Sequence, residues 1–572
     1  MVTKINHPPR LVILGLDGGS LDFLENWANQ GLLPHFHEFF QNGVAAHLTS
    51  IIPPITPAAW TSFMTGYNPG KHGLFDFMEP SGNSYEMRYT NALSRRADTI
   101  WQRLNAAGIR VGVYNVPMTF PPDQVLGFMI SGMDTPAADS DFIYPRELRA
   151  ELNRVFGGVD LESRHLGFMK NDVLRSRLIQ EIKTHETRRT EIFLYLLEQH
   201  PVDVAMLVYR ATDIVQHFFW HYQDPNHHWY PAVKGHPFGH SIQDIYRHLD
   251  HELGRLLEAL PDTTQVIIMS DHGAGGTGGT VFYPNRFLAR EGFLSLKSSK
   301  TRAERYFHRW FRGMDQWLRG RLSPEQKSWL AQHFPGVRHW WESAYTGYSR
   351  IDWARTRAFA NEILALTPGI WINLKSRFPQ GVVEPGTDYH SLLEDIKARL
   401  MALHWEGRPL IRRVYYRDEI YSGPYRDQAP DLILDWWEEA SFVCKPSFAS
   451  GLDGPIMERT PDFRPDLAEW SGTHRLNGVL LMKGAPFRRG TRLSNAHICD
   501  LTPTILYLLD LPVPEDSDGQ ILREAFDPDF LAAHPTQLKG KGQDFQPLKD
   551  GTYSEAEAEK IAAKLKEIGY LG

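Results

Sequence analysis

The sequence predicts an α/β protein in which helices cover both faces of a mostly parallel sheet. Strand-like apolar runs alternate with amphipathic helical patterns through the first half of the chain, which is typical of parallel strands joined by helices. Three of these runs precede an aspartate: residues 11–16 precede Asp17, residues 204–208 precede Asp213, and residues 266–270 precede Asp271. Ligands bind beyond the carboxyl ends of such strands, so we expect the three carboxylates to lie in one site.

The helices between these strands are predicted from apolar residues at helical spacing. A helix after Ser20, a long amphipathic helix through residues 178–197 and a helix through residues 242–256 follow from this spacing. The last two lead into the strands that precede Asp213 and Asp271. This order gives the alternation of strand and helix that a parallel sheet requires.

Beyond residue 295 the pattern changes. Residues 302–318 form a predicted helix with an aromatic stripe opposed by arginines. We expect this stripe to pack on the body of the protein rather than to face lipid, and whether the segment closes over substrate or joins subunits stays open. A helix at 388–400, followed by strand candidates at 410–416 and 432–436, indicates a small α+β subdomain.

The last part of the chain resumes the core pattern with a strand at 477–482 and a helix at 500–509, and a capping box at Ser554 then opens a helix expected to stop at Gly569. The predicted division is a catalytic core in 1–295, a helical insertion in 296–350, a return to the core in 351–380, an α+β cap in 381–455, the rest of the core in 456–525, and a tail with a helix in 526–572.

Length and composition restrict the class of protein. A chain of 572 residues exceeds one ordinary hydrophobic core, and 42% hydrophobic with 23% charged residues is typical of a soluble globular protein. The formal net charge of -7 gives no electrostatic reason to expect a nucleic acid polymer or an anionic membrane as partner. With only Cys444 and Cys499, no secretory segment and no run of transmembrane length, we expect a cytoplasmic enzyme.

Two acidic residues are paired with histidines at informative spacings. Asp213 and His217 are four residues apart, so on a helix they share one face and could hold one cation, although this spacing often occurs by chance. Asp271 and His272 open a glycine-rich run at 273–279, where a turn would let the carboxylate and the imidazole converge. A histidine satisfied within a loop is the alternative interpretation of the second pair.

Thr56 and His474 complete the candidate set. Pro57 suits the first position of a helix, so Thr56 is predicted to be the N-cap, with its hydroxyl at the positive end of the helix. A nearby metal would make that hydroxyl a nucleophile, whereas without metal ligands a capping threonine is the simpler interpretation. His474 lies in a small-residue segment expected to be a loop, and it matters because it completes three aspartates and three histidines.

The ordered set resembles the alkaline phosphatase superfamily, and within it the type I phosphodiesterase and nucleotide pyrophosphatase branch. The segment 56–73 is similar to the nucleophile region of that branch, with Thr56 at the nucleophile position. Asp-x-x-x-His falls at 213–217, Asp-His-Gly at 271–273, and the late histidine at position 474. The resemblance covers most of the chain except the aromatic insertion and the tail, and it implies an alkaline phosphatase-like fold.

The resemblance also implies two divalent cations and a covalent mechanism. The side chains that would hold the cations form two sets: Asp213, His217 and His474 for one, and Asp17, Asp271, His272 and the Thr56 oxygen for the other. Mixed oxygen and nitrogen donors suit Zn²⁺, and Mn²⁺ or Fe²⁺ are compatible with the same donors. Thr56 would attack phosphorus to form a phosphothreonine, which water would hydrolyse.

Departures from related enzymes narrow the reaction. Sulfatases of the superfamily need a cysteine or serine where this chain has Thr56. Alkaline phosphatases clamp a dianionic monoester with an arginine next to the nucleophile, and Pro57 has no donor for that role, so a diester is expected. Nucleotide pyrophosphatases commonly offer the phosphate an asparagine where this chain has Phe77, which makes Phe77 a candidate substrate-binding residue.

The sequence therefore predicts a soluble, metal-dependent phosphodiesterase that acts on a small, nucleotide-like or other organic phosphate ester. A phosphomonoesterase, a phosphonate hydrolase or a phospholipid-headgroup hydrolase at the same site is the first alternative. A catalytically silent binding protein is the second, and the complete set of ligand residues disfavours it. The oligomeric state stays open, a homo-oligomer included.

Overall fold

The computed structural model describes residues 4–82, 84–161, 169–297, 348–362, 369–438, 442–447, 452, 454–465, 470–540, 553–568 and 570. The aromatic helix predicted at 302–318 lies outside the described residues, and so does Gly569. Among the described residues, no helix combines the length and the apolar character needed to cross a bilayer.

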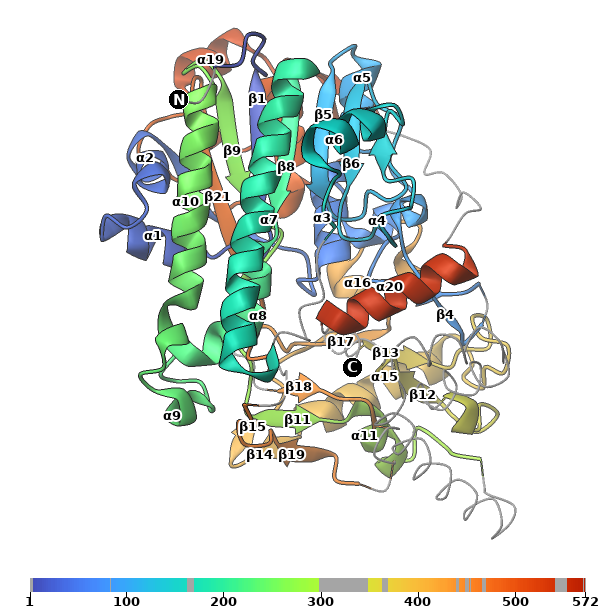
Figure 1. Ribbon diagram of the computed structural model, residues 1–572. Coiled ribbons are helices and arrows are strands. Elements are labelled where there is room, and N and C mark those ends of the chain that lie inside the picture. Colours follow the sequence, from blue (N-terminus) through green and yellow to red (C-terminus); the bar gives the residue numbers. More distant parts are fainter. Residues whose placement is uncertain are drawn as a thin grey trace.

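A nine-stranded sheet forms the centre of the molecule (Figure 1). Its strands lie in the order β22 (Thr491–Arg492), β2 (Gly43–Thr49), β21 (Asn477–Lys483), β9 (Gln265–Met269), β1 (Leu11–Leu16), β8 (Val204–Tyr209), β5 (Val111–Val116), β6 (Gly127–Ser131) and β7 (Ile143–Tyr144). The five strands from β9 to β6 run parallel to one another, whereas β21 and β7 are antiparallel to their neighbours. The predicted mostly parallel α/β sheet is thus confirmed.

Strand β1 is the central strand for the chemistry that follows. Every residue of β1 is buried, as expected for a parallel strand whose two faces are both covered and whose sequence is one continuous apolar run. It pairs in parallel with β8 on one side and with β9 on the other. The carboxyl ends of these three strands therefore meet at one edge of the sheet.

Two groups of helices pack around the sheet. In one group, α10 contacts α2, α7 and α8; in the other, α3 contacts α5 and α18. The helices are α1 (Leu21–Asn29), α2 (Pro34–Asn42), α3 (Thr56–Thr65), α4 (Pro69–His72), α5 (Ile100–Ala106), α6 (Leu148–Phe156), α7 (Asp172–Gln199), α8 (Ala211–Gln223), α9 (Tyr230–Val233), α10 (Ser241–Ala259), α11 (Pro284–Arg290), α15 (Thr387–Met401), α16 (Arg417–Ile420), α18 (Leu501–Leu508), α19 (Pro528–Ala533) and α20 (Glu555–Ile568). Those predicted at 178–197, 242–256 and 500–509 correspond to α7, α10 and α18.

Short strands form smaller sheets beside the central one. They are β3 (Met78–Pro80) with β4 (Met87–Tyr89), β10 (Gly273–Gly276) with β20 (Gly472–Arg475), β11 (Thr280–Phe282) with β18 (Val443–Cys444) and β19 (Met457–Arg459), β14 (His404–Trp405) with β15 (Arg408–Pro409), and β23 (Val513–Pro514) with β24 (Leu538–Lys539). A four-stranded antiparallel sheet contains β12 (Ala358–Ala360), β13 (Gly369–Ile372), β17 (Leu432–Leu434) and β16 (Val414–Tyr416).

The four-stranded sheet joins two segments that the predicted division assigned to different parts of the chain. Strand β13 lies in 351–380, the segment expected to return to the core, yet it pairs with β17 from the expected cap. Strands of three or four residues carry too little periodicity to reveal their partners in sequence, because pairing is decided by contacts between distant segments. The predicted strand at 410–416 is also shorter than expected, since β16 begins at Val414. The domain boundaries themselves stay a prediction.

A buried histidine makes the fold sensitive to acid. The fully buried His72 accepts a hydrogen bond from the Leu74 N–H at Nδ1, so its Nε2–H donates to the Ser62 Oγ at 2.9 Å. Burial, followed by the charge of Arg95, lowers the pKa of His72 to about 3. Between pH 6.5 and pH 3 the unfolded chain therefore binds the extra proton, and the free energy of unfolding falls with falling pH.

We expect this one residue to contribute a slope of up to about 1.4 kcal/mol per pH unit in that window. Urea denaturation of the wild type and of His72→Gln at several pH values between 6.5 and 4.5 measures it. The variant should show the flatter dependence of the free energy of unfolding on pH. Equal slopes in the two proteins would contradict the buried, neutral state of His72.

Candidate active site

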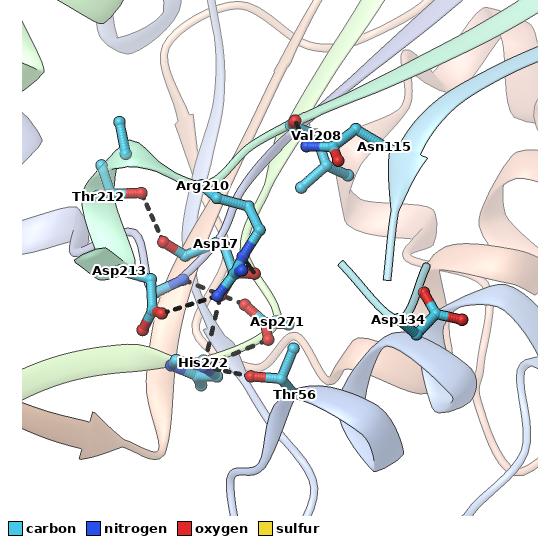
Figure 2. Close-up of polar contacts among 12 residues, drawn as sticks. Asp17, Thr56, Asn115, Asp134, Val208, Arg210, Thr212, Asp213, Asp271 and His272 are labelled. Carbon is cyan, nitrogen blue, oxygen red and sulfur yellow. Dashed lines mark hydrogen bonds and ion pairs between the residues drawn. The ribbon is translucent and has the colours of Figure 1, made fainter. Parts of the chain in front are cut away.

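The three predicted aspartates lie together at the carboxyl edge of the central sheet. Asp17 follows β1 directly, Asp271 lies two residues beyond β9, and Asp213 occupies the first turn of α8, which begins just after β8. Because β1 pairs in parallel with both β8 and β9, the three strand ends bring these carboxylates to one place. Figure 2 shows their side chains converging with His272 and Arg210, with Thr56 beside them.

Thr56 lies at the start of α3 and points into this group. Helix α3 begins at Thr56 with Ile55 as N-cap, one residue earlier than predicted, so the expectation that Thr56 is the N-cap was wrong. Among the described residues, no hydrogen bond joins the Thr56 side chain to a backbone N–H of α3. Its hydroxyl is fully buried, and its Oγ1 lies 3.4 Å from the His272 Nε2 instead. The side chain is thus turned toward the aspartates and histidines rather than toward its own helix.

His474 reaches the site on a strand, not on the predicted loop. Strand β20 pairs antiparallel with β10, so that His474 lies opposite Ala274. A turn was expected in the glycine-rich segment 273–279, yet residues 273–276 form β10, and Gly273 there allows close packing. A Cβ atom on Gly273 would lie only 2.0 Å from the Asn477 carbonyl oxygen. Two backbones approach this closely only where glycine has no side chain in the way. Glycine is common in turns as well as at such close contacts, so the composition alone could not distinguish the two.

The first predicted ligand set is assembled around Asp213. The Asp213 Oδ1 lies 3.0 Å from the His217 Nε2 and 3.6 Å from the His474 Nε2. The two Nε2 atoms are 3.2 Å apart, and all three side chains are buried. One oxygen and two nitrogen donors therefore face a common point, which is a donor set that could hold one divalent cation.

The second predicted set lies next to the first. The His272 Nε2 is 3.7 Å from the Asp17 Oδ1 and 3.3 Å from the Asp271 Oδ2. Potential ligand atoms of Asp17, Asp213 and His272 all lie within 4.8 Å of one another, so Asp213 borders both sets. The structure thus brings together all seven residues that the sequence singled out as ligands or nucleophile.

Backbone carbonyls orient the three imidazoles. The Nδ1 atoms of His217, His272 and His474 lie 2.9, 2.9 and 2.8 Å from the carbonyl oxygens of Gly472, Gly273 and Pro54. A carbonyl oxygen can only accept, so each Nδ1–H donates and each Nε2 keeps its lone pair. A histidine that ligates a metal is normally held in this way through its other nitrogen.

The charge balance of the buried cluster favours added positive charge. Burial, followed by the charge of Asp17, raises the pKa of Asp271 well above its usual range. Burial, followed by the charge of His474, lowers the pKa of His272 well below its usual range. Although burial opposes ionisation of Asp213, His217 and His474 hold the pKa of that carboxyl well below normal. A bound divalent cation would favour the ionised carboxylates and the neutral imidazoles throughout.

Arg210 lies within the site, and the sequence did not single it out. Its Nε donates to the Asp17 Oδ2 at 3.1 Å and its Nη2 to the Asp213 Oδ2 at 3.3 Å, so one guanidinium joins a residue from each ligand set. The Glu186 Oε1 accepts hydrogen bonds from the backbone N–H groups of Arg210 and Ala211. A polar residue directly after the strand β8 was the signal available in the sequence.

Tyr570 is a second residue that was missed, and no sequence signal pointed to it. Its hydroxyl lies 3.5 Å from the Thr56 Oγ1 and 3.4 Å from the Asp213 Oδ2. Burial, followed by the charge of Asp213, raises the pKa of Tyr570 well above its usual range, so the phenol stays protonated. The predicted substrate-binding residue Phe77 packs against it, with ring centroids 4.8 Å apart.

The residues present fit divalent cations. Asp17, Asp213 and Asp271 are almost wholly buried, and the Arg210 guanidinium forms ion pairs with Asp17 and Asp213. The Oδ2 of Asp271 is buried and has no hydrogen-bond donor among the described residues. Buried charges are retained when they are paired or coordinate metals, so this cluster has the character of a metal centre.

The chain is similar to a known protein family in sequence and to solved structures in fold. The model of the family described as type I phosphodiesterase / nucleotide pyrophosphatase matches residues 11–447. No curated protein matches the sequence. Solved structures that resemble the chain include human ectonucleotide pyrophosphatase / phosphodiesterase 5, with 12% identity, a TM-score of 0.47, and coverage of 91% of this chain and 100% of that one.

Two further solved structures show a comparable likeness. One is the inactive murine ectonucleotide pyrophosphatase / phosphodiesterase 5 in complex with AMP, with 13% identity, a TM-score of 0.48, and coverage of 91% of this chain and 100% of that one. The other is phosphonoacetate hydrolase from Sinorhizobium meliloti 1021 in complex with phosphonoformate, with 15% identity, a TM-score of 0.47, and coverage of 88% of this chain and 97% of that one.

Proposed function

Because the chain belongs to the type I phosphodiesterase and nucleotide pyrophosphatase family, and is therefore a hydrolase of phosphoric ester bonds, we propose that it cleaves small phosphodiesters with Thr56 as covalent nucleophile. The observation that carries this proposal is the position of the Thr56 Oγ1, 3.4 Å from the His272 Nε2 at the border of two metal-ligand sets. Among the described residues, this hydroxyl is within hydrogen-bond distance of the His272 Nε2 and the Tyr570 hydroxyl and not of the backbone of its own helix, which suits attack rather than helix capping.

The cations are assigned to the two sets of side chains. Asp213, His217 and His474 would hold one, and Asp17, Asp271, His272 and Thr56 the other, with Zn²⁺ proposed from the mixed donors and Mn²⁺ or Fe²⁺ as alternatives. When bound, they would lower the proton affinity of the Thr56 hydroxyl and stabilise charge on the leaving oxygen.

Residues of the chain itself hold the Thr56 hydroxyl and the ligand side chains in position. Helix α3 fixes the Thr56 hydroxyl at its amino end, where the helix dipole favours negative charge. Arg210 holds Asp17 and Asp213 in place, and the three carbonyl-anchored imidazoles keep their Nε2 atoms directed inward. Thr56 would attack phosphorus and release the alcohol, and water would then hydrolyse the phosphothreonine.

A diester is the proposed substrate because the charge near Thr56 suits a monoanionic phosphate. Pro57 offers no donor next to the nucleophile, and the Nε and Nη2 of Arg210 already donate to carboxylates. A dianionic monoester would need such a clamp.

The described cysteines Cys444 and Cys499 are free and buried, which supports the further proposal that the enzyme works in the cytoplasm.

A rate comparison on activated esters tests the substrate class. We expect kcat/KM for bis(4-nitrophenyl) phosphate to exceed that for 4-nitrophenyl phosphate by about tenfold or more, because only the monoester carries a second charge that the site does not neutralise. A chelator should abolish both activities and added Zn²⁺ should restore them. Faster turnover of the monoester would favour the phosphomonoesterase alternative, and faster turnover of 4-nitrophenyl phenylphosphonate would favour the phosphonate alternative.

A further inference from the structure

The side chain of Tyr570 fills the space directly in front of Thr56. Its ring centroid lies 4.8 Å from that of Phe77, 5.1 Å from that of Trp470 and 6.0 Å from that of His217. Tyr570 is only 2% exposed. The space between Thr56 and the rings of Phe77, Trp470 and His217, which we call the aromatic slot, is therefore occupied by Tyr570, a residue 514 positions after Thr56 in the chain.

Contacts far from the site hold this tyrosine in place. Helix α20 precedes it and buries Ile561, Leu565 and Ile568, and Figure 1 shows the helix, in red, below the central sheet. Tyr553 donates to the Asp134 carbonyl oxygen at 2.6 Å, which fixes the segment before the helix.

At the other end of α20, the Tyr570 N–H donates to the Leu565 carbonyl oxygen at 2.8 Å, so the chain folds back over the end of the helix. The position of Tyr570 at the site is thus held by the docked helix α20 and not by the contacts of its own side chain alone.

The phenol oxygen lies close to both the proposed nucleophile and a residue of the first ligand set. In an in-line displacement at phosphorus, the attacking and leaving oxygens lie on opposite sides of the phosphorus atom. The Thr56 Oγ1 lies beside His272 of the second ligand set. The Tyr570 oxygen lies 3.5 Å from it, beside Asp213 of the first set. A phosphoryl group in reach of Thr56, together with its leaving oxygen, would therefore need space that the Tyr570 hydroxyl now fills.

We propose that Tyr570 is an intramolecular occupant of the leaving-group position, so that a substrate must displace its phenol ring before Thr56 can react. This inference rests on the proposed function of Thr56. It adds that, in the enzyme without substrate, the side chain of Tyr570 occupies the active site. Because the slot accepts a phenol between Phe77 and Trp470, an aryl alcohol is the class of leaving group that fits it.

Two variants separate this role from that of a hydrogen-bond donor. Tyr570→Ala empties the slot, whereas Tyr570→Phe keeps the ring and removes only the hydroxyl. If the ring competes with substrate, the fraction of protein able to bind rises in Tyr570→Ala, and KM for bis(4-nitrophenyl) phosphate falls by about tenfold at similar kcat. Tyr570→Phe should keep a KM close to that of the wild type.

A binding measurement gives a second readout that needs no turnover. Calorimetric titration of the full-length, metal-loaded protein with phenylphosphonate should show about tenfold tighter binding to Tyr570→Ala than to the wild type or Tyr570→Phe. Unchanged affinity and KM in Tyr570→Ala would overturn the proposal, and so would a loss of kcat shared by both variants, because that result assigns the hydroxyl to the reaction. Neither result depends on whether Thr56→Ala retains activity, so the two proposals fail separately.

Discussion

Replacing Thr56 with alanine is expected to reduce kcat/KM on bis(4-nitrophenyl) phosphate by about three orders of magnitude or more, while leaving metal content nearly unchanged. The hydroxyl is the proposed nucleophile, and its removal leaves no group 3.4 Å from the His272 Nε2 to form the covalent intermediate. The Thr56 side chain forms no hydrogen bond with the described backbone of α3, so the helix should lose little stability in the variant. Steady-state kinetics together with metal analysis of the purified protein measure both quantities.

Thr56→Ser is the matched control for this substitution. It keeps a hydroxyl at the start of α3 and should retain turnover well above that of Thr56→Ala. Rapid quenching of the Thr56→Ser or wild-type reaction, followed by mass spectrometry of the peptide that contains residue 56, should reveal a phosphorylated hydroxyl. Wild-type turnover by Thr56→Ala would falsify the nucleophile assignment.

The second large effect is expected from the first ligand set. His217→Gln should lower the bound transition metal from about two to about one equivalent per chain and reduce kcat/KM by about 100-fold or more. The reason is geometric, since the His217 Nε2 lies 3.0 Å from Asp213 and 3.2 Å from the His474 Nε2, and glutamine cannot place a nitrogen donor there in the same orientation. Elemental analysis after purification without chelators gives the metal content.

The chain offers a control on the same helix. His221 lies one turn after His217 on α8 and is also buried, but it belongs to neither ligand set. His221→Gln should therefore keep two equivalents of metal. If both variants bound the same amount of metal as the wild type, the assignment of the first set would be wrong, whereas an equal loss in both would indicate damage to α8 rather than to a ligand.

The sequence alone determined the strands that carry the chemistry. Apolar runs before Asp17, Asp213 and Asp271 are local features, and a continuous apolar run buried on both faces is itself the signature of a parallel strand. The spacing of four between Asp213 and His217 likewise needed only the geometry of one helix, which α8 confirmed. The Ser554 capping box was also local, and the bond from the Ser554 N–H to Glu557 bears it out.

Only the tertiary structure decided how distant segments meet. The pairing of β10 with β20 placed His474 in a strand, because the close approach depends on contacts between residues about 200 positions apart. The same holds for β13 and β17, and for Tyr570, whose hydroxyl reaches the site only because α20 docks on the body of the protein. Local periodicity fixes which residues form an element and which face is buried, whereas the partner of that face is selected by the packing of the whole chain.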